Sequence, residues 1–248
     1  MFLAITLLVP FILLGMAEGA LRLFGPDTSF PLFVPAVVGD GRYLVANPQV
    51  GRRYFGPTAN APAPPAEFFA SRKPANGFRL FVMGESTTAG FPYPRNGTFS
   101  RLLRDALRDV LPGDSVEVIN LGIAATNSVA MRDLAGEVVA AHPDAVLVYA
   151  GHNEYYGVLG AASARGGALA PVLVRASLQL QRLRLGMAVR RVLAGSPDAA
   201  ADSAPSFMEV LARDREVVLD GDLFERCAAQ YGANLGALLA TFRRAGIA

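Results

Sequence analysis

Between residues 77 and 155, short apolar runs alternate with longer segments in which apolar residues recur every three or four positions. The apolar runs are "FRLFVMG", "VEVINLG" and "AVLVYAG", each of which ends in glycine and has the length of a buried parallel strand. The periodic segments, "SRLLRDALRDVL" and "SVAMRDLAGEVVAA", predict amphipathic helices between them. Strands joined by helices of this length require right-handed crossovers, so the pattern predicts an α/β fold with a parallel, doubly wound sheet.

The segments around this region differ in composition. Residues 25–76 are rich in proline and glycine, as in "GPTANAPAPPAEF", which predicts a linker that acts as a tether or lies along the surface. We expect the folded domain to span residues 77–248, with a helical insertion at about 157–221 that is rich in leucine and arginine. For the Leu/Arg part of this insertion, residues 171–193, an amphipathic lid on a membrane surface is the alternative to an ordinary solvated helix.

The end of the chain predicts one more helix. Its apolar positions run from Ala228 to Phe242, and Gly246 has the position of a C-cap. Only "IA" follows, so the next strand of this unit is too short to cover the apolar face of the helix. We therefore expect the sheet to be incomplete at the C-terminus, with a fourth strand beyond Ala248.

Residues 1–24 begin with an uninterrupted apolar stretch. No residue from Phe2 to Ala17 is charged, and an extension to Leu21 approaches the roughly 20 residues that cross a bilayer as a helix. The proline at position 10 is tolerated in membrane helices. We therefore expect a transmembrane anchor or signal-anchor, with a cleaved signal peptide and a buried soluble helix as alternatives. No basic flank orients this segment in a membrane.

Composition narrows the class of protein. The net charge is +2, and Lys73 is the only lysine, so the positive charges are almost all arginines. The arginines do not cluster among residues that could contact bases, as a nucleic-acid-binding surface requires. We therefore expect no nucleic-acid partner. The single cysteine, Cys227, excludes an internal disulfide, and 52% hydrophobic residues allow a sizeable core.

Three loops carry groups that suit acyl transfer, each directly after a predicted strand. Ligands of an open parallel sheet bind at the carboxyl ends of its strands. The loop "GEST" supplies Ser86 as a candidate nucleophile, and "NLGIAATNS" supplies Gly122, where a backbone N–H can approach a ligand closely. The loop "GHNEYY" supplies the side-chain amide of Asn153. Convergent N–H donors stabilise a tetrahedral oxyanion by about 3 kcal/mol each.

These loops resemble the sequence blocks of the SGNH (GDSL-type) hydrolases over roughly residues 77–155. The three blocks, in chain order, are Gly84-Glu85-Ser86, Asn120-Leu121-Gly122 and Gly151-His152-Asn153-Glu154. The resemblance implies a three-layer αβα, flavodoxin-like fold of the SGNH type and a serine esterase without metal or organic cofactor. It implies that Ser86 is the nucleophile and that the N–H groups of Ser86 and Gly122 form the oxyanion hole with Asn153. The N-terminal segment resembles that of the anchored bacterial members, which implies a membrane-anchored catalytic domain outside the cytoplasm.

The sequence departs from the family pattern in two respects. Glu85 and Glu154 stand where the commonest pattern has aspartate, in positions that shape the turns. The last block of the family, an Asp followed three residues later by the catalytic His, has no match in this chain. Of the two histidines, His142 is expected at the edge of the sheet opposite the site, and the side chain of His152 is expected to face away from the oxyanion. We therefore expect the general base to lie beyond Ala248.

Together these features predict an enzyme that hydrolyses ester bonds of a small-molecule or polysaccharide substrate, such as a carbohydrate of the cell envelope. An O-acyltransferase with the same site is one alternative, because the shape of the pocket selects the acceptor. A binding or scaffold module that lacks a base is another. For Ser86 alone, the alternative is a turn serine bonded to its own backbone, and Asn127 either caps a helix or reaches the site.

Overall fold

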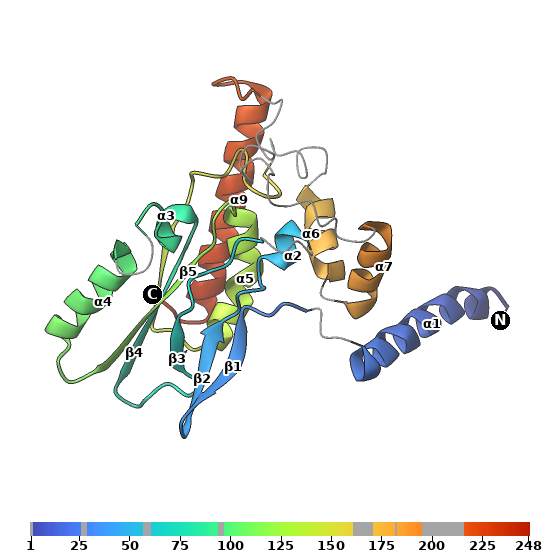
Figure 1. Ribbon diagram of the computed structural model, residues 1–248. Coiled ribbons are helices and arrows are strands. Elements are labelled where there is room, and N and C mark those ends of the chain that lie inside the picture. The colour runs from blue at the N-terminus through green and yellow to red at the C-terminus, as the bar shows by residue number, and fades with distance from the viewer. Residues whose placement is uncertain are drawn as a thin grey trace, which may run out of the picture.

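The computed structural model describes residues 2–25, 29–56, 61–93, 97–160, 171–181, 183–194 and 216–248. Figure 1 shows how its helices and strands are arranged. The helices are α1 (Phe2–Phe24), α2 (Arg52–Phe55), α3 (Ser86–Ala89), α4 (Phe99–Val110), α5 (Ser128–Ala140), α6 (Pro171–Gln181), α7 (Arg184–Ala194) and α9 (Asp222–Arg244). The strands are β1 (Phe33–Val38), β2 (Gly41–Ala46), β3 (Phe68–Ala70), β4 (Gly77–Gly84), β5 (Ser115–Gly122) and β6 (Ala145–Tyr149).

A parallel sheet in the order β5-β4-β6 organises the α/β part of the chain. Strand β4 pairs with both neighbours, so that Gly84 at its end lies beside Gly122 of β5 and Tyr149 of β6. The carboxyl ends of the three strands therefore meet at one edge. The three predicted apolar runs correspond to these strands and the two periodic segments to α4 and α5, which confirms an α/β fold with a parallel sheet.

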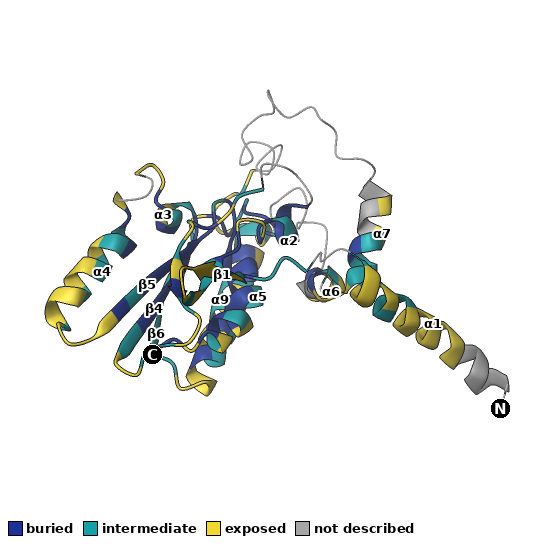
Figure 2. Ribbon diagram, turned by 60° about the horizontal axis from the view of Figure 1, so that its bottom comes forward, coloured by how far each residue is buried: buried dark blue, intermediate teal, exposed yellow. Residues whose placement is uncertain are grey.

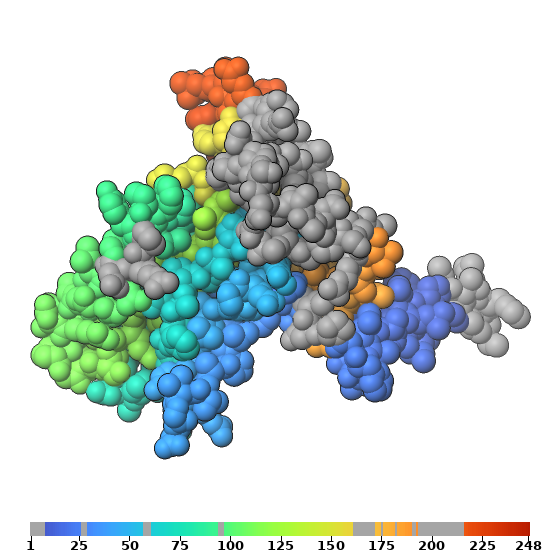
Figure 3. Space-filling model, in the orientation of Figure 1, coloured from blue at the N-terminus to red at the C-terminus, as the bar shows by residue number. Residues whose placement is uncertain are grey.

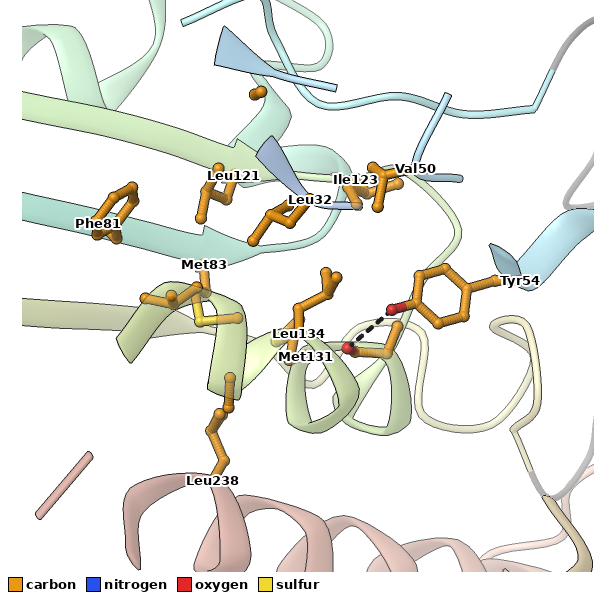
Figure 4. Close-up of a cluster of buried hydrophobic side chains, with 14 of the residues drawn as sticks. Leu32, Val50, Tyr54, Phe81, Met83, Leu121, Ile123, Met131, Leu134 and Leu238 are labelled. Atoms are coloured by element: carbon orange, nitrogen blue, oxygen red, sulfur yellow. Dashed lines mark hydrogen bonds between the residues drawn. The ribbon is translucent and has the colours of Figure 1, made fainter. Parts of the chain in front are cut away.

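Helices cover both faces of this sheet (Figures 1 and 2). Because successive side chains of a strand point to opposite faces, β4 presents Leu80 and Val82 to α4 and presents Phe81 and Met83 to α5. Figure 4 shows Phe81 and Met83 in a cluster that Leu238 of α9 closes from below. Burial on both faces explains why these strands are apolar almost throughout rather than alternating.

The segment that the sequence analysis expects to be a linker is folded against the domain. Strands β1, β2 and β3 form an antiparallel sheet, and Leu32, Val50 and Tyr54 enter the same core cluster as Leu134 of α5 (Figure 4). In Figure 3 the segment as a whole, coloured blue to cyan, lies directly beside the green residues of the α/β part. Proline and glycine prevent long helices here, but they permit short strands joined by turns.

Two buried arginines join this segment to the α/β part. Arg53 forms ion pairs with Asp133 at 3.1 Å and with Glu137 at 2.7 Å, both on α5. Arg79 of β4 is 1% exposed and pairs with Glu117 of β5 at 2.7 Å. It also donates to the backbone oxygens at positions 70 and 141, at 2.7 and 2.6 Å, so its charge is fully compensated. These contacts fix β3 and α2 against the sheet that carries the candidate site.

Residues 2–24 form a helix, but none of the helices in the described ranges is long and apolar enough to cross a membrane. The uncharged run from Phe2 to Ala17 is shorter than the roughly 20 residues that span a bilayer. Glu18 and Arg22 follow it as an ion pair at 2.7 Å. Glu18 also accepts hydrogen bonds from the backbone N–H groups of Arg184 and Leu185, at 3.2 and 2.8 Å, which attach this end of α1 to α7.

The prediction that residues 1–24 anchor the protein in a membrane is therefore wrong. The prediction of a membrane partner and the prediction of a membrane-anchored localisation both rested on that helix, so both are wrong as well. The charged end of α1 contacts another helix of the same chain, where a transmembrane helix would continue as apolar sequence.

The predicted insertion and the end of the chain are described in part. Two helices, α6 and α7, form where the leucine-rich segments predict them, whereas residues 161–170 and 195–215 lie outside the described residues. The final predicted helix is α9. After it, Ala248 lies beside β6: its oxygen accepts from the N–H of Val146 at 2.8 Å, and its N–H donates to the oxygen of Asp144 at 3.3 Å. This is the bonding pattern of a parallel neighbour of β6.

Candidate functional site

Ser86 lies at the sharp junction where β4 ends and α3 begins. Glu85 is in extended conformation and Ser86 is the first residue of α3, so the chain turns between the two. The side chain of Ser86 is partly exposed, and its hydroxyl makes no hydrogen bond to any other described residue. The described structure therefore does not contain the alternative arrangement, in which the Ser86 hydroxyl is hydrogen-bonded to its own backbone in a turn. A hydroxyl without a partner among the described residues is available to a substrate and to a base.

Two glycines allow α3 to lie directly on the strand ends. A Cβ on Gly84 would collide with the side chain of Thr88 and would approach the backbone oxygen of Tyr149 to 2.5 Å. A Cβ on Gly122 would collide with the backbone of Thr88 and Ala89. Any other residue at either position would displace α3, and Ser86 with it.

Gly122 has a second role that involves its backbone. Its N–H donates to Oδ1 of Asn120 at 2.9 Å, and the amide nitrogen of Asn120 donates to the backbone oxygen of Thr88 and to Ser100 Oγ. Asn120 is 1% exposed and ties β5 to both α3 and α4. The role of the Gly122 N–H in an oxyanion hole stays a prediction, and it requires that the bond to Asn120 be exchanged for one to the ligand.

Asn153 follows β6 in the third loop and is almost completely buried. Its backbone N–H donates to Glu85 Oε2 at 3.0 Å, and its backbone oxygen accepts from the N–H of Gly157 at 2.7 Å. Its side-chain nitrogen is buried and has no hydrogen-bond partner among the described residues. A buried amide without an acceptor costs about 1–3 kcal/mol, and such groups occur where a ligand completes the bonding. The fixed backbone and the unpaired amide are what an oxyanion donor requires.

Two buried carboxylates hold the loop that contains Asn153. Glu85 is 1% exposed and accepts from the N–H groups of Gly151 and Asn153 at 3.1 and 3.0 Å. Burial raises the pKa of Glu85 to about 7; the nearby charge of Glu154 raises it further, whereas the backbone donors lower it. Glu154 accepts from the N–H and the hydroxyl of Ser128, both at 2.7 Å, and burial raises its pKa as well. Both acids stabilise the turn, as the sequence pattern indicates.

The second loop contributes further polar groups. Asn127 is the N-cap of α5, because its Oδ1 accepts from the N–H of Val129 at 3.2 Å, and its side-chain nitrogen is buried without a partner in the described structure. Ala125 has a φ of +58° and its oxygen accepts from the N–H of Val158 at 2.9 Å, which joins the second loop to the third. The structure therefore confirms the capping role of Asn127.

Helix α9 supports the same loops from a distant part of the chain. Tyr231 Oη donates to the backbone oxygen of Ala150 at 3.2 Å, and Asn234 Nδ2 donates to Ser128 Oγ at 3.2 Å. Sequence reasoning assigned no role to either residue, and it named Asn120 only as part of the block that contains Gly122. Asn120 had a readable signal, since a polar residue inside an apolar strand is unusual and must be hydrogen-bonded. For the other two, helical periodicity indicates only burial.

The two histidines occupy different ends of the sheet. His142, which precedes β6, is exposed at the edge opposite Ser86. His152 lies in the loop of the site, with Nδ1 at 3.7 Å from Glu85 Oε2 and its ring in edge contact with Tyr149. Its side chain is 51% exposed, and neither histidine is hydrogen-bonded to Ser86. The geometry assigns neither of them as the general base.

An open, mostly apolar cavity of about 470 Å³ lies beside Thr87, the residue that follows the candidate nucleophile. It is lined by Thr87, Phe99, Leu147, Val148 and Tyr149. Thr87 follows Ser86 directly, and Tyr149 contacts Phe99 on one side and His152 on the other. The volume is in the range of small-molecule sites, about 300–1,000 Å³.

The fold and site define an α/β protein with a parallel sheet. Its strand ends carry a serine hydroxyl and a buried side-chain amide nitrogen that have no hydrogen-bond partner among the described residues. No cluster of potential metal ligands occurs in the described ranges of the chain. No protein-family model, no curated protein and no solved structure matches the sequence.

Proposed function

We propose that the protein is a serine esterase of the SGNH type. One observation carries this proposal: Ser86, with a free hydroxyl, and Asn153, with a buried and unpaired amide, follow adjacent parallel strands and are joined through Glu85. A nucleophile beside a fixed amide donor is the arrangement that acyl transfer needs. The proposal includes a doubly wound, flavodoxin-like sheet, which the order β5-β4-β6 with helices on both faces supports.

The reaction follows from the position of each group. Ser86 Oγ attacks the ester carbonyl carbon while its proton passes to a general base, and the carbonyl oxygen becomes an oxyanion. The side-chain amide of Asn153 and the N–H of Ser86 donate to this oxygen, with Gly122 as a further donor. The C–O bond to the alcohol then breaks, the base returns the proton to the leaving alcohol, and water hydrolyses the acyl-serine.

The cavity beside Thr87 indicates which part of the ester it receives. Its lining by Leu147, Tyr149 and Phe99 suits an apolar acyl group rather than a sugar hydroxyl. The partly exposed Ser86 leaves the alcohol portion, from a small molecule or a polysaccharide, on the open side. The substrate class is therefore an ester whose acyl group is apolar.

The test is hydrolysis of p-nitrophenyl acetate and butyrate by the protein produced from its complete reading frame. We expect Ser86→Ala to abolish hydrolysis, whereas Ser115→Ala, at the exposed and opposite end of β5, should not change it. A fluorophosphonate should label the Ser86 peptide, as mass spectrometry would detect. We expect His152→Ala to retain most of the activity.

Undiminished hydrolysis by Ser86→Ala would refute the proposal. If the wild-type protein showed neither hydrolysis nor labelling, a binding or scaffold module would be favoured instead.

A further inference from the structure

The loop that contains Asn153 is held on both sides by a carboxylate clamp, which consists of Glu85 and Glu154. Glu85 connects the end of β4 to the backbone of the loop, and Glu154 connects the loop to Ser128 at the start of α5. Both side chains are buried, at 1% and 5% exposure. The position of the Asn153 amide therefore depends on carboxylates that water does not reach.

The two oxygens of Glu85 are both engaged. Oε1 accepts from the N–H of Gly151 and Oε2 accepts from the N–H of Asn153. An ionised carboxylate accepts both bonds, and bonds to a charged acceptor are roughly twice as strong as neutral ones. A proton on either oxygen converts that oxygen into a donor and a much weaker acceptor, so one of the two N–H groups loses its partner.

We propose that Glu85 is a positioning residue whose ionised carboxylate holds the Asn153 amide beside Ser86, and whose protonation releases the loop. This inference rests on the proposed esterase function for its catalytic consequence. The structural part, a loop held by the charge state of one buried acid, does not depend on it.

The groups that face Glu85 determine where it titrates. Glu154, on the same loop, is a like charge that opposes ionisation of Glu85. Tyr231 of α9 also faces both acids, and its pKa is raised by burial and by the negative charges of Glu154 and Glu85. His152 Nδ1 lies at 3.7 Å and favours ionised Glu85 when the imidazole is protonated. Burial outweighs the backbone donors, so the pKa of Glu85 is raised to about 7 and the clamp responds near neutral pH.

The first experiment does not use activity. In ¹⁵N-labelled full-length protein, we expect the amide resonances of Gly151 and Asn153 to shift together between pH 5 and 9, with one midpoint near 7. Glu85→Gln should abolish this shared titration. Glu154→Gln is the matched control, because it removes the other buried acid and should retain a titration in the same pH range. The resonance of Ala46, whose N–H donates to a backbone oxygen in the N-terminal segment, should not follow this midpoint.

The second experiment measures ester hydrolysis across the same pH range. We expect kcat to fall at least tenfold below the midpoint while KM changes less than twofold, because an oxyanion donor acts mainly in the transition state. Glu85→Asp keeps the charge and should retain the pH dependence that Glu85→Gln loses.

The outcomes separate the two proposals. Amide shifts that do not titrate, or that titrate unchanged in Glu85→Gln, would overturn the clamp even in an active enzyme. If the Gly151 and Asn153 resonances titrated together but kcat did not change over the same pH range, the positioning role would be overturned. Absence of hydrolysis would refute the esterase, while the resonances of Gly151 and Asn153 would still decide whether the clamp exists.

Discussion

The backbone N–H of Asn153 donates a 3.0 Å hydrogen bond to Oε2 of Glu85, the residue that directly precedes Ser86. The bond spans two adjacent strand ends, so one side chain joins the segments that carry Ser86 and Asn153, the proposed nucleophile and amide donor. The side chain of Asn153 contributes nothing visible to stability, because its nitrogen has no partner in the described residues. This separation of backbone and side-chain roles makes the candidate site testable.

Replacing Asn153 with alanine should impair catalysis far more than folding. Removal of one oxyanion donor lowers kcat by about 10²–10³, and removal of an unpaired buried amide relieves a desolvation cost. We therefore expect ester hydrolysis to fall in that range, while the free energy of unfolding stays within about 1 kcal/mol. Urea denaturation and steady-state kinetics measure the two effects. Asn76→Ala, at an exposed position, is the control, and equal activity of both variants would exclude Asn153 from the site.

Gly122→Ala should destabilise the protein. The new Cβ would collide with the backbone of Thr88 and Ala89, and such overpacking costs about 1–3 kcal/mol or more. Gly136→Ala, in α5 with open space around the position, should instead stabilise by about 0.5–1 kcal/mol. Unfolding in urea compares the two variants. Equal stabilities would mean that α3 does not approach β5 as closely as this structure has it.

The stability of the protein should depend on pH through Glu85. Burial raises the pKa of Glu85 to about 7 in the folded protein, from 4.5 for an unperturbed carboxyl group, so the folded state holds the extra proton between these values. Stability therefore falls as pH rises through this window, by on the order of 3 kcal/mol for this group alone. The difference in unfolding free energy between wild type and Glu85→Gln, measured from pH 4 to 9, should show this slope. A difference that does not vary with pH would contradict the raised pKa.

The cavity beside Thr87 should determine the preferred acyl length. Leu147→Trp fills part of the lining, and we expect it to lower kcat/KM for p-nitrophenyl butyrate at least fivefold more than for the acetate. Leu102→Trp is the matched control, because Leu102 is 65% exposed on α4 and does not line the cavity. If both variants lowered the two rates equally, the acyl group would bind elsewhere.

The region from β4 to β6 was predictable because its signals are local. A buried parallel strand is a short apolar run, and an amphipathic helix repeats every three to four residues, so both are readable in windows of a dozen residues. The placement of Ser86 and Asn153 at one edge then follows from parallel pairing alone. For Gly122, the sequence led us to expect a close approach of its N–H to a ligand, which stays a prediction; the close contact in the structure is with the backbone of α3.

The features that sequence reasoning missed depend on contacts between distant residues. Strands β1–β3 satisfy their backbone only by pairing with one another, and Arg53 finds Asp133 at a separation of 80 residues. The membrane prediction failed in a related way, because hydropathy registers the apolar run of α1 but not the attachment of Glu18 to α7.

The sequence by itself determined the α/β alternation, the approximate bounds of α4 and α5 and the identity of the candidate polar groups, but not the short helix α3 that begins at Ser86. Only the tertiary structure decided that the Ser86 hydroxyl and the Asn153 side-chain nitrogen have no hydrogen-bond partner in the described part of the chain, and that the N–H of Gly122 is bonded to Asn120. The physical reason is that periodicity reports which face of an element is apolar. Hydrogen-bond satisfaction and the pKa of a buried acid depend instead on which groups the fold brings within about 3 Å of one another.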